Sequence, residues 1–83
     1  MLINYIHTAL RHAKYELMEN NRFFGSIPEC QGAWGDGATL EECREELQSV
    51  LEDWIVFRLS RGLDIPVIDG IDLNPKKEYA EAD

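Results

Sequence analysis

The fold is decided by residues 39–62, which read TLEECREELQSVLEDWIVFRLSRG. Apolar side chains recur in this stretch at the three- and four-residue spacing of a helix with one buried face. A helix of this kind is stable when its apolar face lies against another element. The pattern therefore predicts one long amphipathic helix packed on a sheet, with an apolar face made of Leu40, Cys43, Leu47, Val50, Leu51, Trp54, Ile55 and Phe57.

Both ends of this helix are marked in the sequence. Thr39 and Glu42 form a capping box, in which the hydroxyl accepts from the N–H of residue 42 and the carboxylate reaches back. Arg58 and Arg61 suit the negative C-terminal end of the helix dipole, and Gly62 can adopt the left-handed conformation that ends a helix. We therefore expect the helix to begin at Thr39 and to stop at Gly62.

The opposite side of the helix is acidic. A metal ion or a catalytic acid/base pair needs carboxylates that converge on one point, and this spacing gives no convergence. We therefore predict no catalytic residue, no metal site and no cofactor, and a protein that works by binding rather than by catalysis. The candidate partner-binding residues are the acidic positions of this helix face: Glu41, Glu42, Glu45, Glu46, Glu52 and Asp53.

The residues before the helix predict a short helix and a three-stranded meander. Residues 1–12 have helical apolar spacing and are expected to lie as a lid on the sheet edge. From Ala13 the pattern alternates, as in a half-exposed strand. Asn20 and Asn21 tolerate positive φ and predict a hairpin into a second strand, 22–27. A third strand is expected at 32–35, where glycines mark a bulge or a close approach of the backbone.

The residues after the helix predict a fourth, short edge strand at 65–68, because Pro66 lacks a backbone donor and is restricted to an edge. Asp69 and Gly70 form a turn, and residues 74–83 are expected to be a flexible acidic tail. The predicted fold class is α+β in a single domain, residues 1–73. Its N-terminal helix is 1–12 and its core is 13–73.

Three kinds of residue that often carry chemistry are given structural roles. Cys30 and Cys43 are expected to be two small, partly buried thiols rather than a disulfide. The two histidines lie five positions apart and are expected at the surface or at a cap. The aromatic residues of the sheet lack the basic neighbours of an RNA-binding surface and are expected in the core. They are Phe23, Phe24 and Trp34.

Size and charge limit the function. Eighty-three residues suit one hydrophobic core. A net charge of −8 repels nucleic-acid phosphates and anionic lipid, and attracts a basic protein. No stretch approaches the roughly 18 apolar residues of a membrane span. We therefore expect a cytoplasmic protein with no membrane association and no direct nucleic-acid binding by this chain alone.

Two strings of residues resemble a known family. Residues 27–43 read IPECQGAWGDGATLEEC, and residues 63–67 read LDIPV. A strand ending in Ile-Pro-Glu, a glycine-containing strand, a threonine that opens a helix with two acidic residues, and a later Ile-Pro segment resemble the HicB-like antitoxin domain. The resemblance covers Lys14–Ile68.

This resemblance implies a degraded ribonuclease-H-like α+β fold without nuclease activity. It also implies a partner, a small basic HicA-type toxin that cleaves messenger RNA and is neutralised by binding. HicB antitoxins usually carry a further DNA-binding segment, and the residues after Gly70 are too few to form one, so operator binding by this chain is not expected.

Three hypotheses follow from the sequence. The first is an antitoxin or antitoxin-like module that binds a small basic protein. The alternative is a stand-alone structural or regulatory homo-oligomer, in which strand edges or the helix at 1–11 pair with copies of themselves. A surviving nuclease, the third hypothesis, requires a carboxylate cluster that the spacing does not supply.

Overall fold

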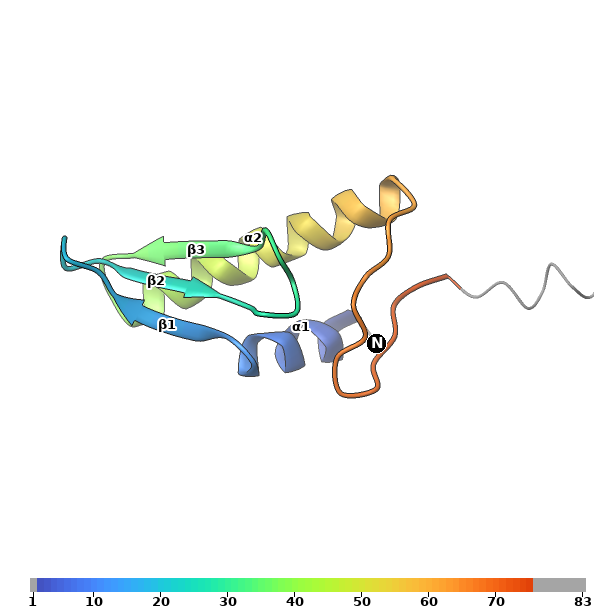
Figure 1. Ribbon diagram of the computed structural model, residues 1–83, viewed down its shortest axis with the longest axis horizontal. Coiled ribbons are helices and arrows are strands. Elements are labelled where there is room, and N and C mark those ends of the chain that lie inside the picture. Colours follow the sequence, from blue (N-terminus) through green and yellow to red (C-terminus); the bar gives the residue numbers. More distant parts are fainter. Residues whose placement is uncertain (1, 76–83) are drawn as a thin grey trace, which may run out of the picture.

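The computed structural model describes residues 2–75. Its three strands form an antiparallel meander in the order β1-β2-β3, and the long helix α2 crosses one face of this sheet (Figure 1). The α+β class predicted from the sequence is confirmed. In chain order the elements are α1 (Leu2–Arg11), β1 (Lys14–Leu17), β2 (Phe23–Ser26), β3 (Trp34–Gly37) and α2 (Leu40–Ser60).

The hairpin between β1 and β2 forms where it was predicted. Asn21 has a φ of 64°, in the left-handed region that asparagine tolerates better than most residues. The chain reverses with the Met18 N–H donating to the Arg22 carbonyl at 2.7 Å. The resulting register places Tyr15 opposite Gly25.

The third strand runs over Trp34–Gly37, two residues later than predicted. Gly32 has a φ of 96° and belongs to the preceding turn rather than to the strand. Pairing with β2 is regular from end to end, so β3 contains no bulge. Its glycines instead allow close approach of the backbone to α2, since a Cβ on Gly35 would lie 2.8 Å from the Leu47 nitrogen.

The N-terminal cap of α2 matches the predicted capping box in one of its two bonds. The Thr39 hydroxyl accepts from the Glu42 N–H at 3.1 Å, as expected. The Glu42 carboxylate accepts from the N–H of Ala38 at 3.2 Å, one residue before the cap. Two donors at the start of the helix are therefore satisfied by side chains.

The C-terminal end of α2 is a Schellman motif. Gly62 has a φ of 68°, and its N–H donates to the Leu59 carbonyl at 3.2 Å. The Leu63 N–H donates to the Arg58 carbonyl at 2.8 Å. These two bonds satisfy carbonyls that the last turn leaves free, so the predicted stop at Gly62 is confirmed.

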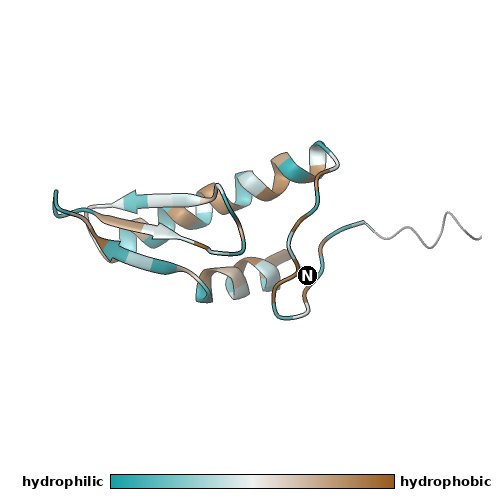
Figure 2. Ribbon diagram, viewed as in Figure 1, coloured by the Kyte–Doolittle hydropathy of each residue, from teal (hydrophilic) through white to brown (hydrophobic). Residues whose placement is uncertain are grey.

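The apolar face of α2 is buried along its centre and exposed at its ends. Cys43, Leu47, Leu51 and Ile55 are buried, whereas Leu40 and Phe57 are 46% and 51% exposed. A helix of 21 residues is about 32 Å long, much longer than strands of four residues, so its ends project beyond the sheet. Hydrophobic and hydrophilic residues alternate along the ribbon of α2, as expected for a helix with one apolar face (Figure 2).

The helix α1 is not a lid on the sheet edge, which corrects the prediction. It packs mainly against α2 and continues the line of β1 beyond the sheet (Figure 1). There it covers the part of α2 that the short strands cannot reach. Its buried residues include Tyr5, Ala9 and Leu10.

The edge strand predicted at 65–68 does not form. In place of a ladder there is one isolated bridge between Ile68 and Ile71. We call residues 63–75 the strap, because Ile65 and Ile68 are buried in the core without being part of the sheet. The strap needs other ties for its backbone, since Pro66 has no N–H to donate to a ladder.

Side chains tie the strap to the rest of the fold. Asn74 accepts from the Ile65 N–H at 2.7 Å and donates to the Ile65 carbonyl at 2.8 Å, which are the two bonds a neighbouring strand would make. The Tyr5 hydroxyl donates to the Pro66 carbonyl at 2.6 Å. Asn74 is therefore an integral residue and not the start of a tail. The remainder of the predicted tail, 76–83, lies outside the described residues.

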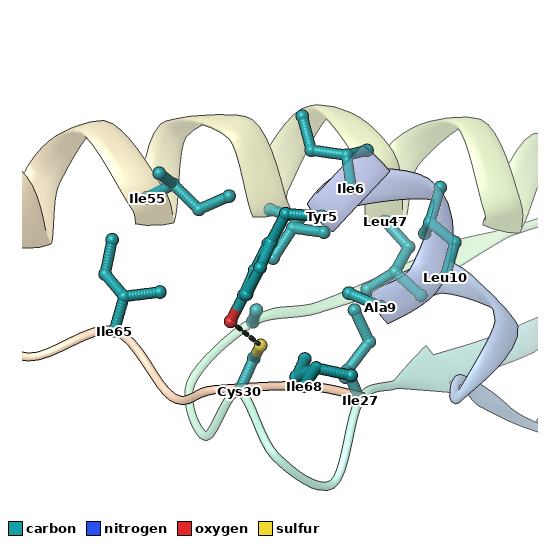
Figure 3. Close-up of a cluster of buried hydrophobic side chains, with 12 residues drawn as sticks. Tyr5, Ile6, Ala9, Leu10, Ile27, Cys30, Leu47, Ile55, Ile65 and Ile68 are labelled. Atoms are coloured by element: carbon teal, nitrogen blue, oxygen red, sulfur yellow. Dashed lines mark hydrogen bonds between the residues drawn. The ribbon is translucent and has the colours of Figure 1, made fainter. Parts of the chain in front are cut away.

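The core joins both helices, the loop 27–33 and the strap (Figure 3). Cys30 and Cys43 are free thiols, and both are fully buried rather than partly buried as predicted. The Cys30 sulfur lies 3.9 Å from the Tyr5 hydroxyl oxygen, and burial raises the pKa of both side chains. Neither group is ionised near neutral pH, as suits a packing role.

Candidate partner-binding surface

The structure brings all six predicted partner-binding residues to one exposed face of α2. Successive residues of a helix are about 100° apart, so these side chains line up opposite the buried Leu47 and Leu51. We call them the acidic stripe. Every member is exposed: Glu41, Glu42, Glu45, Glu46, Glu52 and Asp53.

The carboxylates of the acidic stripe form no ion pair within the described residues. The ion pairs between side chains of residues 2–75 join His12 to Glu29 and Asp69, and Arg22 to Asp36. None of them involves a stripe carboxylate. The stripe therefore adds to the negative field of the chain, and a basic protein surface would be attracted to it.

The stripe is not built as a metal site. Its carboxylates are spread over about three turns of helix. Among residues 2–75 no group of three or more histidine, cysteine, aspartate or glutamate side chains is arranged to hold a metal ion. The arrangement suits contact along a surface rather than coordination of one atom.

A groove between α1 and α2 borders the acidic stripe. We call it the α1/α2 groove; it has a volume of about 250 Å³ and contains an aliphatic residue, Ile3, that is 68% exposed. Glu52 belongs both to the stripe and to the groove wall, so an anionic surface and an aliphatic contact lie side by side. The residues that line the groove are Ile3, Ile6, His7, Gln48 and Glu52.

The groove was not predicted from the sequence. Ile3 lies off the apolar periodicity of the N-terminal helix, and its neighbour one turn on is His7. The position of Ile3, an aliphatic residue outside the apolar face of the helix and next to His7, was the signal in the sequence that could have indicated the groove. The packing of α1 against α2, which creates the groove, depends on contacts far apart in the sequence.

The acidic stripe ends in an apolar turn. Val56 lies one helical turn after Glu52 on the same side and is 65% exposed. Leu59 and Leu63 are also exposed near the end of α2. A partner on the stripe would thus meet carboxylates first and aliphatic side chains at the helix end.

The outer face of the sheet carries an aromatic pair. The rings of Phe24 and Trp34 lie 5.5 Å apart, and Trp34 is 54% exposed. The prediction of a core position is therefore wrong for Trp34 and Phe24, and Phe23 is only half-buried and lies outside the core cluster. Because Gly35 faces α2 and neighbouring residues of a strand alternate, Trp34 points away from the helix. The ion pair between Arg22 and Asp36, at 3.0 Å, also lies on this side of the molecule.

A cavity of about 330 Å³ beside Trp54 and Arg58 is a structural junction. Its Trp54 indole N–H donates to the Gln31 carbonyl at 3.0 Å, and the Arg58 guanidinium lies 5.0 Å from the Trp54 ring centroid. The Arg58 Nε also donates to the Asp64 carbonyl at 2.7 Å. These bonds join α2 to the 27–33 loop and to the strap.

The Tyr15 hydroxyl oxygen is buried and has no hydrogen-bond partner within residues 2–75. Burial is the main cause that raises its pKa, and the guanidinium of Arg44 opposes the shift. The nearby cavity of about 190 Å³ is largely apolar, with Leu40 on its wall.

The two histidines lie apart. His7 is exposed in the α1/α2 groove, and His12 lies after the other end of α1 against Glu29 and Asp69. The surface position expected for His7 is confirmed. His12 is half-buried in a network that the sequence did not predict. No helix within the described part of the chain is both long and apolar enough to cross a membrane.

Comparison with known proteins places this fold in a family. A crystal structure of TTHA0281 from Thermus thermophilus is 36% identical to this chain, covers 92% of it and 95% of the other chain, and superposes with a TM-score of 0.84. A comparison with curated proteins gives no significant match. The model of the UPF0150-like family matches residues 4–66. The chain therefore belongs to the UPF0150-like family.

Proposed function

We propose that this chain is an antitoxin-like binding module that neutralises a small basic toxin of the HicA type by protein–protein contact. The observation that carries the proposal is the acidic stripe, six exposed carboxylates on α2 without a cationic partner in residues 2–75. The class of the partner comes from the resemblance of Lys14–Ile68 to the HicB-like antitoxin domain.

The charge of the stripe suits competition with RNA. A protein that binds and cleaves RNA needs basic side chains to hold phosphates. An acidic surface that covers those side chains excludes the substrate without any chemistry of its own. Complementary charge contributes mainly to the association rate and to specificity, and burial of apolar surface contributes most to affinity. In this proposal Ile3 and Val56 supply the apolar contacts beside the stripe.

Co-expression tests the proposal. The chain is expressed together with the small basic protein encoded beside it, and RNA cleavage by that protein is measured with and without the chain. The expected result is a stable complex, suppressed cleavage, and binding that weakens as salt is raised. If no such protein is encoded there, or if the chain neither binds it nor suppresses cleavage at low salt, the antitoxin function fails.

Self-association is the second candidate function, and the sheet favours it. Both β1 and β3 have an edge without a paired strand in residues 2–75, and Trp34 is exposed on the outer face. The net charge of −8 opposes contact between two copies. Light scattering separates the candidates, because a strictly monomeric chain at micromolar concentration excludes the homo-oligomer.

A further inference from the structure

His12 lies where three segments of the chain meet. Its Nδ1 is 2.8 Å from an oxygen of Glu29 in the 27–33 loop. Its Nε2 is 3.0 Å from an oxygen of Asp69 in the strap. Residue 12 itself directly follows α1. One imidazole ring therefore joins parts of the chain that are 17 and 57 positions away from it.

The geometry requires a protonated ring. A neutral imidazole has one N–H donor, and its other nitrogen is an acceptor. Ionised carboxylates are acceptors only, so two carboxylates at hydrogen-bond distance from the two ring nitrogens need both nitrogens to donate. The hydrogen bonds to Asp69 and then to Glu29 raise the pKa of His12, and the bond to His12 lowers the pKa of Glu29.

The segment that His12 holds is anchored by the buried side chain of Ile68 but has few polar ties to the rest of the chain. Asp69 and Gly70 have φ angles of 50° and 81° and form the turn between Ile68 and Ile71. We call residues 68–71 the strap turn. Within the described residues, the side-chain bond that reaches the strap turn comes from His12, because Tyr5 and Asn74 bond the strap further back, at Pro66 and Ile65.

We propose that His12 is a pH-sensitive latch, whose imidazolium fastens the strap turn and the 27–33 loop to the end of α1 and whose deprotonation releases the strap turn. This is a device of the fold itself and goes beyond the proposed binding function. When the proton leaves, one ring nitrogen becomes an acceptor that faces a carboxylate. That hydrogen bond is lost, and the two carboxylates are left without a cation between them.

The charged groups around His12 support this assignment. From the 27–33 loop the facing group is Glu29, and from the strap it is Asp69. The Asp72 carboxylate of the strap accepts from the Asn74 backbone and side-chain amides. The neighbouring cation, Arg11, bonds the Thr8 hydroxyl instead. Carboxylates therefore dominate the surroundings of the ring, and they favour its protonated form.

The direction of the pH effect follows from the two shifts. The His12 contribution is fully present below its ordinary pKa of 6.5 and is lost as pH rises through the raised pKa of the folded state. The Glu29 contribution is present above its ordinary pKa of 4.5 and is lost as pH falls through its lowered pKa. The latch is closed between these limits and opens on the alkaline side when His12 loses its proton.

The test is an NMR titration of the full chain. The His12 ring resonances give its pKa, and hydrogen exchange gives the protection factors of the Ile68 and Ile71 amides, which bond each other across the strap turn. The expected result is a His12 pKa above 6.5 and protection factors that fall with the same midpoint. Each pKa unit above the ordinary value corresponds to about a tenfold weakening of the latch when the proton is lost.

Two variants and one control complete the test. Asp69→Asn keeps a residue that tolerates the left-handed turn, and it should lower the His12 pKa and flatten the pH dependence of protection. His12→Gln should abolish that dependence. The control is His7→Gln, which removes an exposed histidine from the middle of α1 and should change neither quantity.

The latch is overturned if protection at Ile68 and Ile71 stays constant while His12 titrates, or if Asp69→Asn leaves the His12 pKa unchanged. Should His12→Gln fail to fold, Asp69→Asn still decides the question, because Asp69 is exposed and its replacement leaves the core intact.

Discussion

At the residue scale, glycines determine how closely α2 lies on the sheet. Gly35 and Gly37 face the helix backbone at Leu47 and Cys43, where a Cβ atom has no room. The sequence predicted either a bulge or a close approach, and these alternatives could not be separated without the path of α2. The regular register of β3 shows that the close approach is correct.

A methyl group at Gly37 should destabilise the fold. Gly37→Ala places a Cβ against backbone atoms at Glu42 and Cys43, which cannot move without displacing α2. We expect the free energy of unfolding to fall by about 2 kcal/mol or more, the range of overpacked cores. Urea denaturation measures it. The control is Gly70→Asn, at an open position with a φ of 81° that asparagine tolerates, for which a change below about 0.5 kcal/mol is expected.

A loss for Gly37→Ala as small as that of the control would contradict the close packing of β3 on α2.

The candidate site was partly predictable at the residue scale. The six carboxylates of the acidic stripe follow helical periodicity, which is local, so their common face could be predicted and is confirmed. The role of Ile3 and the α1/α2 groove could not be predicted, because the groove exists only when α1 packs against α2. His12 was also missed, since its partners come from loops that the sequence does not place.

At the element scale, elements with local signals formed as predicted and the segment with distant partners did not. The cap at Thr39, the stop at Gly62 and the hairpin at Asn21 depend on neighbouring residues. The strap depends on hydrogen bonds from the Tyr5 hydroxyl and the Asn74 amide. Tyr5 is far from the strap in the sequence, and Asn74 was assigned to the predicted tail. The apolar run at 65–68 therefore predicted a strand, but its backbone is bonded by side chains instead of by a neighbouring strand.

Removal of the Asn74 amide should loosen the strap. Asn74→Ala leaves the N–H and the carbonyl of Ile65 without partners in a partly buried position. We expect a loss of about 1–3 kcal/mol in the free energy of unfolding. The matched control is Gln48→Ala, which removes an exposed amide bonded to Glu52 and should cost less than about 0.5 kcal/mol. Equal losses for the two variants would show that Asn74 does not support the strap.

The groove between α1 and α2 gives a prediction about binding. Ile3→Asp adds a negative charge at an exposed aliphatic position, so it should weaken binding of a basic partner by removing apolar contact despite the added charge. We expect about a tenfold loss of affinity by calorimetry, with unchanged thermal stability. The control is Val67→Asp, an exposed aliphatic residue of the strap outside this groove. Tighter binding by Ile3→Asp would mean that charge alone acts there.

At the scale of the whole molecule, the distribution of charge matters more than its sum. The chain carries a net charge of −8. Within the described residues, His12 and Arg22 form ion pairs with carboxylates outside the acidic stripe, and the stripe carboxylates form none. Uncompensated charge of one sign lowers the stability of a compact protein through self-repulsion. A partner of opposite charge relieves that repulsion, which is why we assign the stripe to recognition.

Charge reversal on the acidic stripe tests whether this face of α2 binds the basic partner. Glu45→Lys with Glu52→Lys is compared with Glu16→Lys and Glu19→Lys, a pair outside α2 that changes the net charge by the same amount. Affinity for the small basic partner is measured at several salt concentrations. We predict about a 10- to 100-fold loss and a weaker salt dependence for the stripe pair, and less than about a threefold loss for the other pair. Equal losses for both pairs would show that the partner responds only to net charge and would contradict the acidic stripe as the binding surface.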